Sequence, residues 1–178
     1  TAGQLSRFWP TKILSTIYVE LLRGLPLLAL ILIGYYVVAF AIGWNHRYSF
    51  GIVIIAVFSG AYLSEIFRAG IQSIPESQRL SARAIGFSER QTYLYVIIPQ
   101  TIRRVLPAST GQFANLIKDS SLLYVISIPE LAMQSRETMS KTYANFEALM
   151  PLIIGYLVLT LPISLYSRHL EKKFGYSE

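Results

Sequence analysis

The chain has 178 residues, of which 53% are hydrophobic and only 15% are charged, and its mean hydropathy is +0.44. Because soluble domains are about 25% charged, this composition argues against a water-soluble globule, and its apolar content argues against disorder. The sequence contains no cysteine, which excludes disulfide frameworks and thiolate metal sites. The length suits a single domain.

Four apolar segments predict an all-α fold, a polytopic helical bundle in a membrane. Leu25–Trp44 holds 20 residues without an ionisable charge, enough helix to cross a hydrocarbon layer of roughly 30 Å. Leu149–Tyr166 gives 18 more uncharged positions, and its prolines are tolerated in membrane helices. Phe50–Ser64 is a shorter third candidate. Val105–Ile128 is the fourth, although it has two charges in its middle.

The positions of the basic residues predict the orientation of these spans. Four spans place segments 1–24, 68–104 and 167–178 on one side, and these carry 3, 6 and 3 of the 16 Lys and Arg residues. Segments 45–49 and 129–148, on the opposite side, carry 3 together, and the remaining basic residue, Lys118, lies inside a span. The positive-inside rule therefore predicts that both ends are cytoplasmic. This membrane topology accounts for the basic pI of about 9.6, so the positive charge does not require a nucleic-acid partner.

The loop 75–99 has helix signals of its own. Pro75 suits a first helical turn, a helix follows over Gln78–Ile85, and Gly86 supplies the left-handed residue that commonly ends a helix. Ser88–Gln91 is a capping box that begins a second helix, which we expect to stop before Pro99. The sequence thus predicts a helix, a glycine break and another helix.

The first helix of this loop has two interpretations. Small side chains at Ser81, Ala82 and Ala84 allow a partner surface to approach the backbone closely. Arg79 and Arg83, four residues apart, can pair with carboxylates of such a partner. Alternatively, the helix lies at the lipid headgroups with its arginines on phosphates. The spacing leaves both interpretations open.

Several motifs resemble those of ABC-importer permeases. Ser81–Gly86, followed by Ile98–Gln100, is similar to the cytoplasmic "EAA" loop of that family, and the best match is its polar amino-acid group. Further segments similar to that group occur in the same order along the chain: Tyr18–Pro26, Ala61–Ile71, Lys118–Leu122 and Pro129–Leu131.

Two departures accompany the resemblance. Leu80 stands where the family has an acidic residue, so any salt bridge made by that residue is absent. Such permeases usually have five spans, and only 17 residues precede Tyr18 here. We therefore expect one or two amino-terminal spans of the family to be missing from this sequence.

The resemblance implies that 1–178 is a single permease domain of an ATP-driven importer for a polar amino acid, in a bacterial cytoplasmic (inner) membrane. Its implied partners are two ATPase subunits that hold ATP and Mg²⁺, a second permease chain (the same or different), membrane lipid, and an extracytoplasmic binding protein. The ATPases would dock on helix 75–86. The residues expected to couple the subunits there are Arg79, Ser81, Ala82, Arg83, Ala84 and Gly86.

Charged residues in the fourth span suggest a transport pathway. An ionised side chain at mid-bilayer costs roughly 2.5–3.5 kcal/mol, so such residues face protein or water and find partners. Lys118 and Asp119 are adjacent and point about 100° apart on a helix, which makes a salt bridge between them awkward. A break in the helix near Ser120 and Ser121 would resolve this and resemble the discontinuous helices of other transporters. We expect these four residues and Asn115 to line the pathway and meet a zwitterionic amino acid. Alternatively, they pair with neighbouring helices, or the span ends early and leaves them in water.

The remaining ionisable residues have simpler interpretations. Glu65 lies three residues before Arg68, which predicts an ion pair along one helix. The two histidines, His46 and His169, lie on opposite sides of the predicted membrane and cannot share a metal ion. The sequence therefore suggests no resident metal or cofactor.

Catalytic motifs do not occur in the sequence. It has no phosphate-binding loop that ends in Gly-Lys-Ser/Thr, no G-x-S-x-G and no H-E-x-x-H. We therefore expect a transport subunit and not an enzyme. Two alternatives remain: a membrane-embedded enzyme that uses Lys118 and Asp119, and a membrane scaffold that transports nothing.

Overall fold

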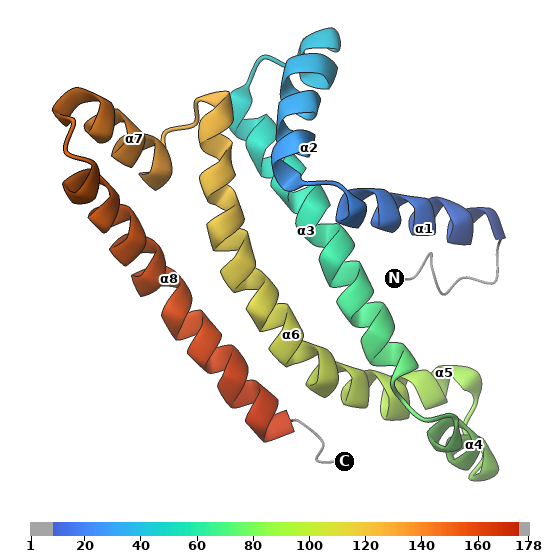
Figure 1. Ribbon diagram of the computed structural model, residues 1–178. Coiled ribbons are helices and arrows are strands. Elements are labelled where there is room, and N and C mark those ends of the chain that lie inside the picture. The colour runs from blue at the N-terminus through green and yellow to red at the C-terminus, as the bar shows by residue number, and fades with distance from the viewer. Residues whose placement is uncertain (1–8, 175–178) are drawn as a thin grey trace.

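The computed structural model describes residues 9–174, and every regular element in that range is a helix (Figure 1). Arg7, part of the predicted basic amino-terminal segment, lies outside the described residues. The α-helices are α1 (Trp9–Gly24), α2 (Leu27–Ile33), α3 (Arg47–Gln72), α4 (Glu76–Ala84), α5 (Glu89–Thr92), α6 (Ile98–Asp119), α7 (Leu131–Thr142) and α8 (Asn145–Phe174). Two π-helical segments and a 3₁₀ helix connect them: η1 (Gly34–Ala39), η2 (Tyr93–Ile97) and η3 (Ser120–Ile126).

Three long helices form the body of the molecule, with α6 packed against both α3 and α8 (Figure 1). The short helices α4 and α5 lie at one end, where α8 also finishes (Figure 1). Helix α7 and the beginning of α3 lie at the opposite end (Figure 1). The basic segments 68–104 and 167–174 lie at the α4 end, whereas α1, which belongs to the third basic segment, lies beside the middle of α3 (Figure 1).

The first predicted span is wrong in its bounds. A sharp bend of 105° separates α1 from the helix formed by α2 and η1. Pro26 caps α2 in an extended conformation, and a proline disfavours helical geometry in the residue before it, so α1 ends at Gly24. The regular helix therefore begins at Leu27, not Leu25, and its π segment ends at Ala39, well before Trp44.

Two other predicted spans are confirmed as continuous helices. Both α3 and α8 are long and apolar enough to cross a membrane, and the α1–α2 pair makes a third candidate if its two arms count as one span. Helix α8 contains Pro151 and Pro162 without a break. Only 6% of its apolar window is buried within the chain, so lipid or another protein must cover the rest.

The fourth predicted span falls on α6 and η3, and α6 is not among the helices of residues 9–174 that are long and apolar enough to cross a membrane. At Ser120 the α-helix continues directly into a 3₁₀ helix, so the predicted break is present only as a change of helix type. The prediction that a helix stops before Pro99 is wrong: α5, η2 and α6 follow one another without a gap. The wide π turn η2 directly precedes the helix that contains the proline.

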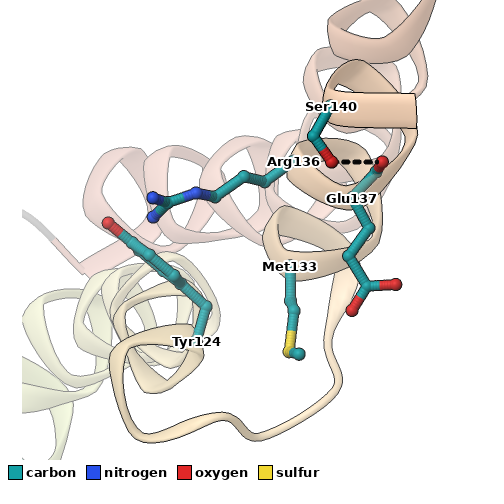
Figure 2. A pocket seen from close by; sticks show the side chains of 5 residues that line it. All are labelled: Tyr124, Met133, Arg136, Glu137 and Ser140. Atoms are coloured by element: carbon teal, nitrogen blue, oxygen red, sulfur yellow. Dashed lines mark hydrogen bonds between the residues drawn. The ribbon is translucent and has the colours of Figure 1, made fainter. Parts of the chain in front are cut away.

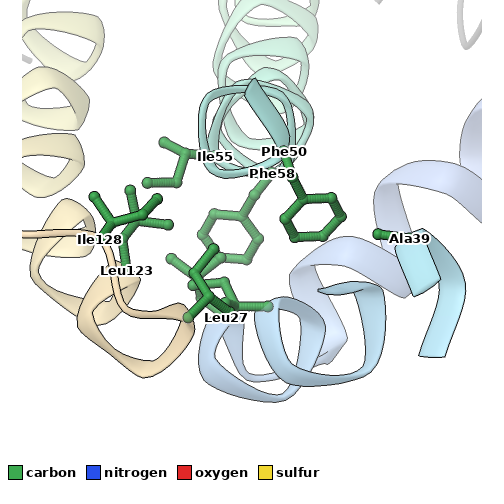
Figure 3. Packing of buried hydrophobic residues seen from close by; sticks show 9 residues of the cluster. Leu27, Ala39, Phe50, Ile55, Phe58, Leu123 and Ile128 are labelled. Carbon is green, nitrogen blue, oxygen red and sulfur yellow. The ribbon is translucent and has the colours of Figure 1, made fainter. Parts of the chain in front are cut away.

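A hydrophobic cluster joins α2, α3 and η3 (Figure 3). Ile31 is fully buried in it, and Phe50 and Phe58 of α3 pack beside Leu123 and Ile126 of η3. The cluster therefore holds the 3₁₀ helix against the opening turns of α3, on the side of the molecule away from α4.

Candidate coupling helix and transport groove

Helix α4 ends in a Schellman turn, as its glycine predicted. Gly86 has φ +88°, its N–H donates to the Arg83 carbonyl at 2.9 Å, and the Phe87 N–H donates to the Ala82 carbonyl at 3.1 Å. The predicted capping box follows, with the Ser88 and Gln91 side chains each bound to the other residue's backbone N–H. This pair of signals fixes the direction in which α4 leaves and α5 begins.

The exposed surface of α4 differs from the predicted one at a single position. Ala82 is only 3% exposed, so it packs α4 against its own chain and its side chain is not available to a partner. The other small residues, Ser81 and Ala84, are exposed. Leu80 and Ile85 are also exposed, at 60% and 72%. Adjacent residues on a helix point in different directions, so Ala82 faces inward although its neighbours Ser81 and Arg83 are exposed. The sequence alone did not show which of the small residues would be buried.

Both arginines of α4 have partners within the chain. The Arg79 guanidinium donates to the Tyr93 hydroxyl at 3.0 Å and lies 5.1 Å from the centre of that ring. Arg83 forms an ion pair with Glu89 of α5. These contacts brace α4 against the helices that follow, and an acidic partner surface would have to compete with them.

An open groove of about 490 Å³ runs along α3, opposite the end of α6 and η3. Its wall is mainly apolar, and Ser59 and Ser120 supply its hydroxyl groups. The Ser59 side chain is buried, and its Oγ has no hydrogen-bond partner among residues 9–174. The complete lining is Gly51, Ile52, Ile55, Ala56, Ser59, Gly60, Leu63, Leu116, Ser120 and Leu123.

The predicted pathway residues cluster where α6 becomes η3, but only Ser120 lines the groove. Asn115 and Lys118 are exposed on α6, whereas Asp119 and Ser121 are half-buried. The structure therefore gathers the predicted residues within two helical turns and directs them to different faces.

Tyr156, which no sequence motif indicated, connects α8 to the residue that begins α7. Its hydroxyl donates to Glu130 Oε2 at 3.2 Å. Glu130 in turn caps α7 by accepting from the N–H groups of Ala132 and Met133, each at 2.7 Å. A phenolic hydroxyl inside the apolar segment 149–166 was the available signal, because a buried hydroxyl needs a hydrogen-bond partner.

The predicted Glu65–Arg68 ion pair is confirmed and has a third member. Arg23 of α1 lies 3.6 Å from the same carboxylate and 5.6 Å from the centre of the Tyr62 ring. The Tyr18 hydroxyl also donates to the Val57 carbonyl at 2.7 Å. Two of the segments that resemble permeases, 18–26 and 61–71, therefore meet in space.

A smaller open cavity of about 270 Å³ lies at the end opposite α4, between η3 and α7 (Figures 1 and 2). Its wall consists of Tyr124, Met133, Arg136, Glu137 and Ser140. The Arg136 guanidinium lies 5.6 Å from the centre of the Tyr124 ring. No signal in the sequence pointed to this cavity, because its two sides come from separate elements.

Long helices that are apolar enough to cross a membrane indicate an integral membrane protein. Residues 1–176 match the family model described as "Binding-protein-dependent transport system inner membrane component", and the chain belongs to this family.

Named relatives agree with this family. The chain is 35% identical over 170 residues to "Probable glutamine ABC transporter permease protein GlnM" of Bacillus subtilis (strain 168), covering 96% of this chain and 79% of the relative. It is 31% identical over 169 residues to "Glutamine transport system permease protein GlnP" of Escherichia coli (strain K12), covering 93% and 76%. A solved structure, "Crystal structure of an amino acid ABC transporter with histidines", matches with a TM-score of 0.88 and 34% identity over 96% of this chain and 80% of that one.

These findings confirm the predicted all-α membrane fold and the predicted family. The chain is a permease subunit of a bacterial ABC importer, a transport component and not an enzyme, and ATP is hydrolysed by the separate ATPase subunit of such systems. The alternatives of a membrane-embedded enzyme and of a scaffold that transports nothing are therefore set aside.

Proposed function

We propose that this permease subunit imports a polar amino acid, with α4 and both ends of the chain on the cytoplasmic side. The names of the relatives support an amino acid, and glutamine in particular. The gathering of basic segments at the α4 end supports the orientation. The observation that carries the proposal is α4 itself, a helix that ends in a Schellman turn and whose outer surface is exposed at this basic end.

In this proposal, α4 docks in a groove on an ATPase subunit. Its exposed apolar side chains, Leu80 and Ile85, suit burial by a protein partner, since burying each would stabilise the contact by about 1.5–3 kcal/mol. Ser81, Ala84 and Gly86 are small enough for that partner to approach the backbone. Two ATPase subunits, which hold the ATP and Mg²⁺, would serve two permease chains.

A second permease chain completes the pathway. Each chain leaves a long groove open and most of the apolar surface of α8 uncovered, so one copy encloses no channel. The second chain is either identical, in a two-fold arrangement, or a close relative. An extracytoplasmic binding protein would approach the opposite end, where the cavity between η3 and α7 opens (Figure 2).

Transport then follows an alternating-access cycle. ATP binding brings the two ATPases together, the two α4 helices move with them, and the groove changes the side to which it opens. Ser120 on the groove wall, together with Asn115, Lys118, Asp119 and Ser121, would contact the ammonium and carboxylate groups of the amino acid. The position of Ser120 on the groove wall supports this role.

Reconstitution of the whole complex in proteoliposomes tests the proposal. The chain should retain an ATPase during purification, and ATP turnover should rise when the substrate and binding protein are added. Ile85→Gln should weaken retention of the ATPase, whereas Leu94→Gln, at a 50%-exposed position on η2, should not. A chain that never retains an ATPase, or equal retention by both variants, would contradict the proposal.

A further inference from the structure

The cytoplasmic halves of α3 and α6 pack closely together at Gly70 of α3. Gly70 is buried, and a Cβ atom added there would lie 2.2 Å from Val105 Cγ1 and 3.4 Å from Thr101 Cγ2. Val105 and Thr101 are each only 4% exposed. The side chains of α6 therefore rest directly on the backbone of α3, and no larger residue fits at position 70 without moving one helix.

A polar contact lies beside this crossing. The Arg104 guanidinium donates to the Ser73 carbonyl at 2.6 Å and to the Ser73 hydroxyl at 3.0 Å. That hydroxyl in turn donates to the Gly70 carbonyl at 2.8 Å. Because Ser73 is the residue that ends α3, one arginine of α6 holds the last turn of α3 in place.

Helix α4 is attached to the same unit without a flexible linker. Only 73–75 separate α3 from α4, and within them Ile74 is 6% exposed and Pro75 has a ring-restricted φ of −58°. On its other side, α4 contacts η2 and α6 through Arg79–Tyr93 at 3.0 Å and Gln78–Gln100 at 3.4 Å. Any displacement of α4 must therefore move the adjoining ends of α3 and α6.

We propose that Gly70, Ser73, Arg104 and Val105 form a clasp that makes α4 and the cytoplasmic halves of α3 and α6 one rigid lever. The clasp transmits displacement of α4 to the groove, whose walls are the more distant turns of α3 and α6. Its four members are positioning residues, since they lie away from the groove lining. This inference rests on the proposed docking of an ATPase at α4.

Uptake per ATP hydrolysed, measured in proteoliposomes that hold the whole complex, tests the lever. Gly70→Ala overpacks the crossing and should lower this ratio about tenfold, while ATP turnover continues. Gly70→Ala combined with Val105→Ala removes the colliding methyl group and should restore the ratio. Arg104→Gln should also lower it.

Two matched controls should leave the ratio at the wild-type value. Gly111→Ala changes another glycine of α6, where an added Cβ would meet only Ser167 Oγ at an ordinary 3.6 Å. Arg103→Gln removes the exposed arginine next to Arg104. A ratio unchanged in Gly70→Ala and Arg104→Gln, or no recovery in the double variant, would overturn the lever.

A distance measurement on the complex tests the lever even if a clasp variant fails to fold. The chain has no cysteine, so Ser77→Cys on α4 and Ile102→Cys on α6 can carry a pair of spin labels. The labelled chain is diluted with unlabelled chain so that each complex holds at most one labelled copy and only the distance within one chain is measured. A rigid lever then gives one narrow distance distribution, identical with and without bound ATP, and a second distance in either state would overturn it. Loss of the ATPase from the complex would instead contradict docking at α4, and the width of the distribution would still report on the clasp.

Discussion

Replacing Gly86 by alanine should weaken ATPase docking without creating a steric clash. No atom lies within 4 Å of a Cβ added at this position, so the only penalty is the left-handed backbone at φ +88°. An L-residue with a side chain pays about 1–2 kcal/mol for that conformation. If α4 must end in its Schellman turn to dock, affinity should fall about 5–30-fold, since 1.4 kcal/mol corresponds to a factor of ten.

The assay is retention of the ATPase by the purified chain, titrated to a dissociation constant. Asparagine tolerates left-handed geometry better than alanine does, so Gly86→Asn should lose less affinity than Gly86→Ala. Gly24→Ala is the matched control: an added Cβ there also meets nothing within 4 Å, but no left-handed φ is required. It should bind as the wild type does.

Two outcomes would refute this reasoning. Equal affinities for Gly86→Ala and Gly24→Ala would show that the turn need not be formed for docking. A loss in Gly86→Asn as large as that in Gly86→Ala would show that the effect comes from something other than backbone strain.

Two further predictions concern charged residues of the membrane helices. Asp119→Asn keeps the side-chain shape but removes a charge that we assign to substrate contact, so uptake in proteoliposomes should fall about tenfold with normal membrane abundance; unchanged uptake would remove Asp119 from the pathway. Glu65→Gln leaves two arginines without their carboxylate and should lower the free energy of unfolding in detergent by about 1–2 kcal/mol, a value reduced for their partial exposure. Glu76→Gln, at a carboxylate whose side chain is 72% exposed, should change it by less than about 0.5 kcal/mol, and equal losses would argue against the cluster.

Local signals in the sequence were enough to predict α3, α8 and the turn between α4 and α5. The long apolar segments that became α3 and α8 predicted spans, because a run of uncharged residues in lipid must satisfy its backbone hydrogen bonds within a helix. Gly86 and Ser88 predicted the turn between α4 and α5, since backbone conformation and capping there depend on neighbouring residues only. The same holds for the Glu65–Arg68 pair, whose members are separated by one turn of a single helix.

Prolines were interpreted less well, because their effect depends on what surrounds them. Pro26 ends one helix and redirects the chain by 105°, whereas Pro99 lies within a continuous helical path behind a π turn. Pro26 has an extended backbone before α2, whereas Pro99 stands in the first turn of α6, directly after the π turn η2. The two prolines have the same effect on their own backbone, so the sequence alone does not distinguish these outcomes.

What only the tertiary structure decided are contacts between segments far apart in the chain. The inward turn of Ala82, the bridge from Tyr156 to Glu130, and the seating of Val105 on Gly70 all depend on how helices cross. The residues within one helical turn determine whether a segment is helical and how the helix ends. Which face meets another helix, and how closely, is set by the shape and volume of side chains contributed by both, and neither sequence segment contains that information alone.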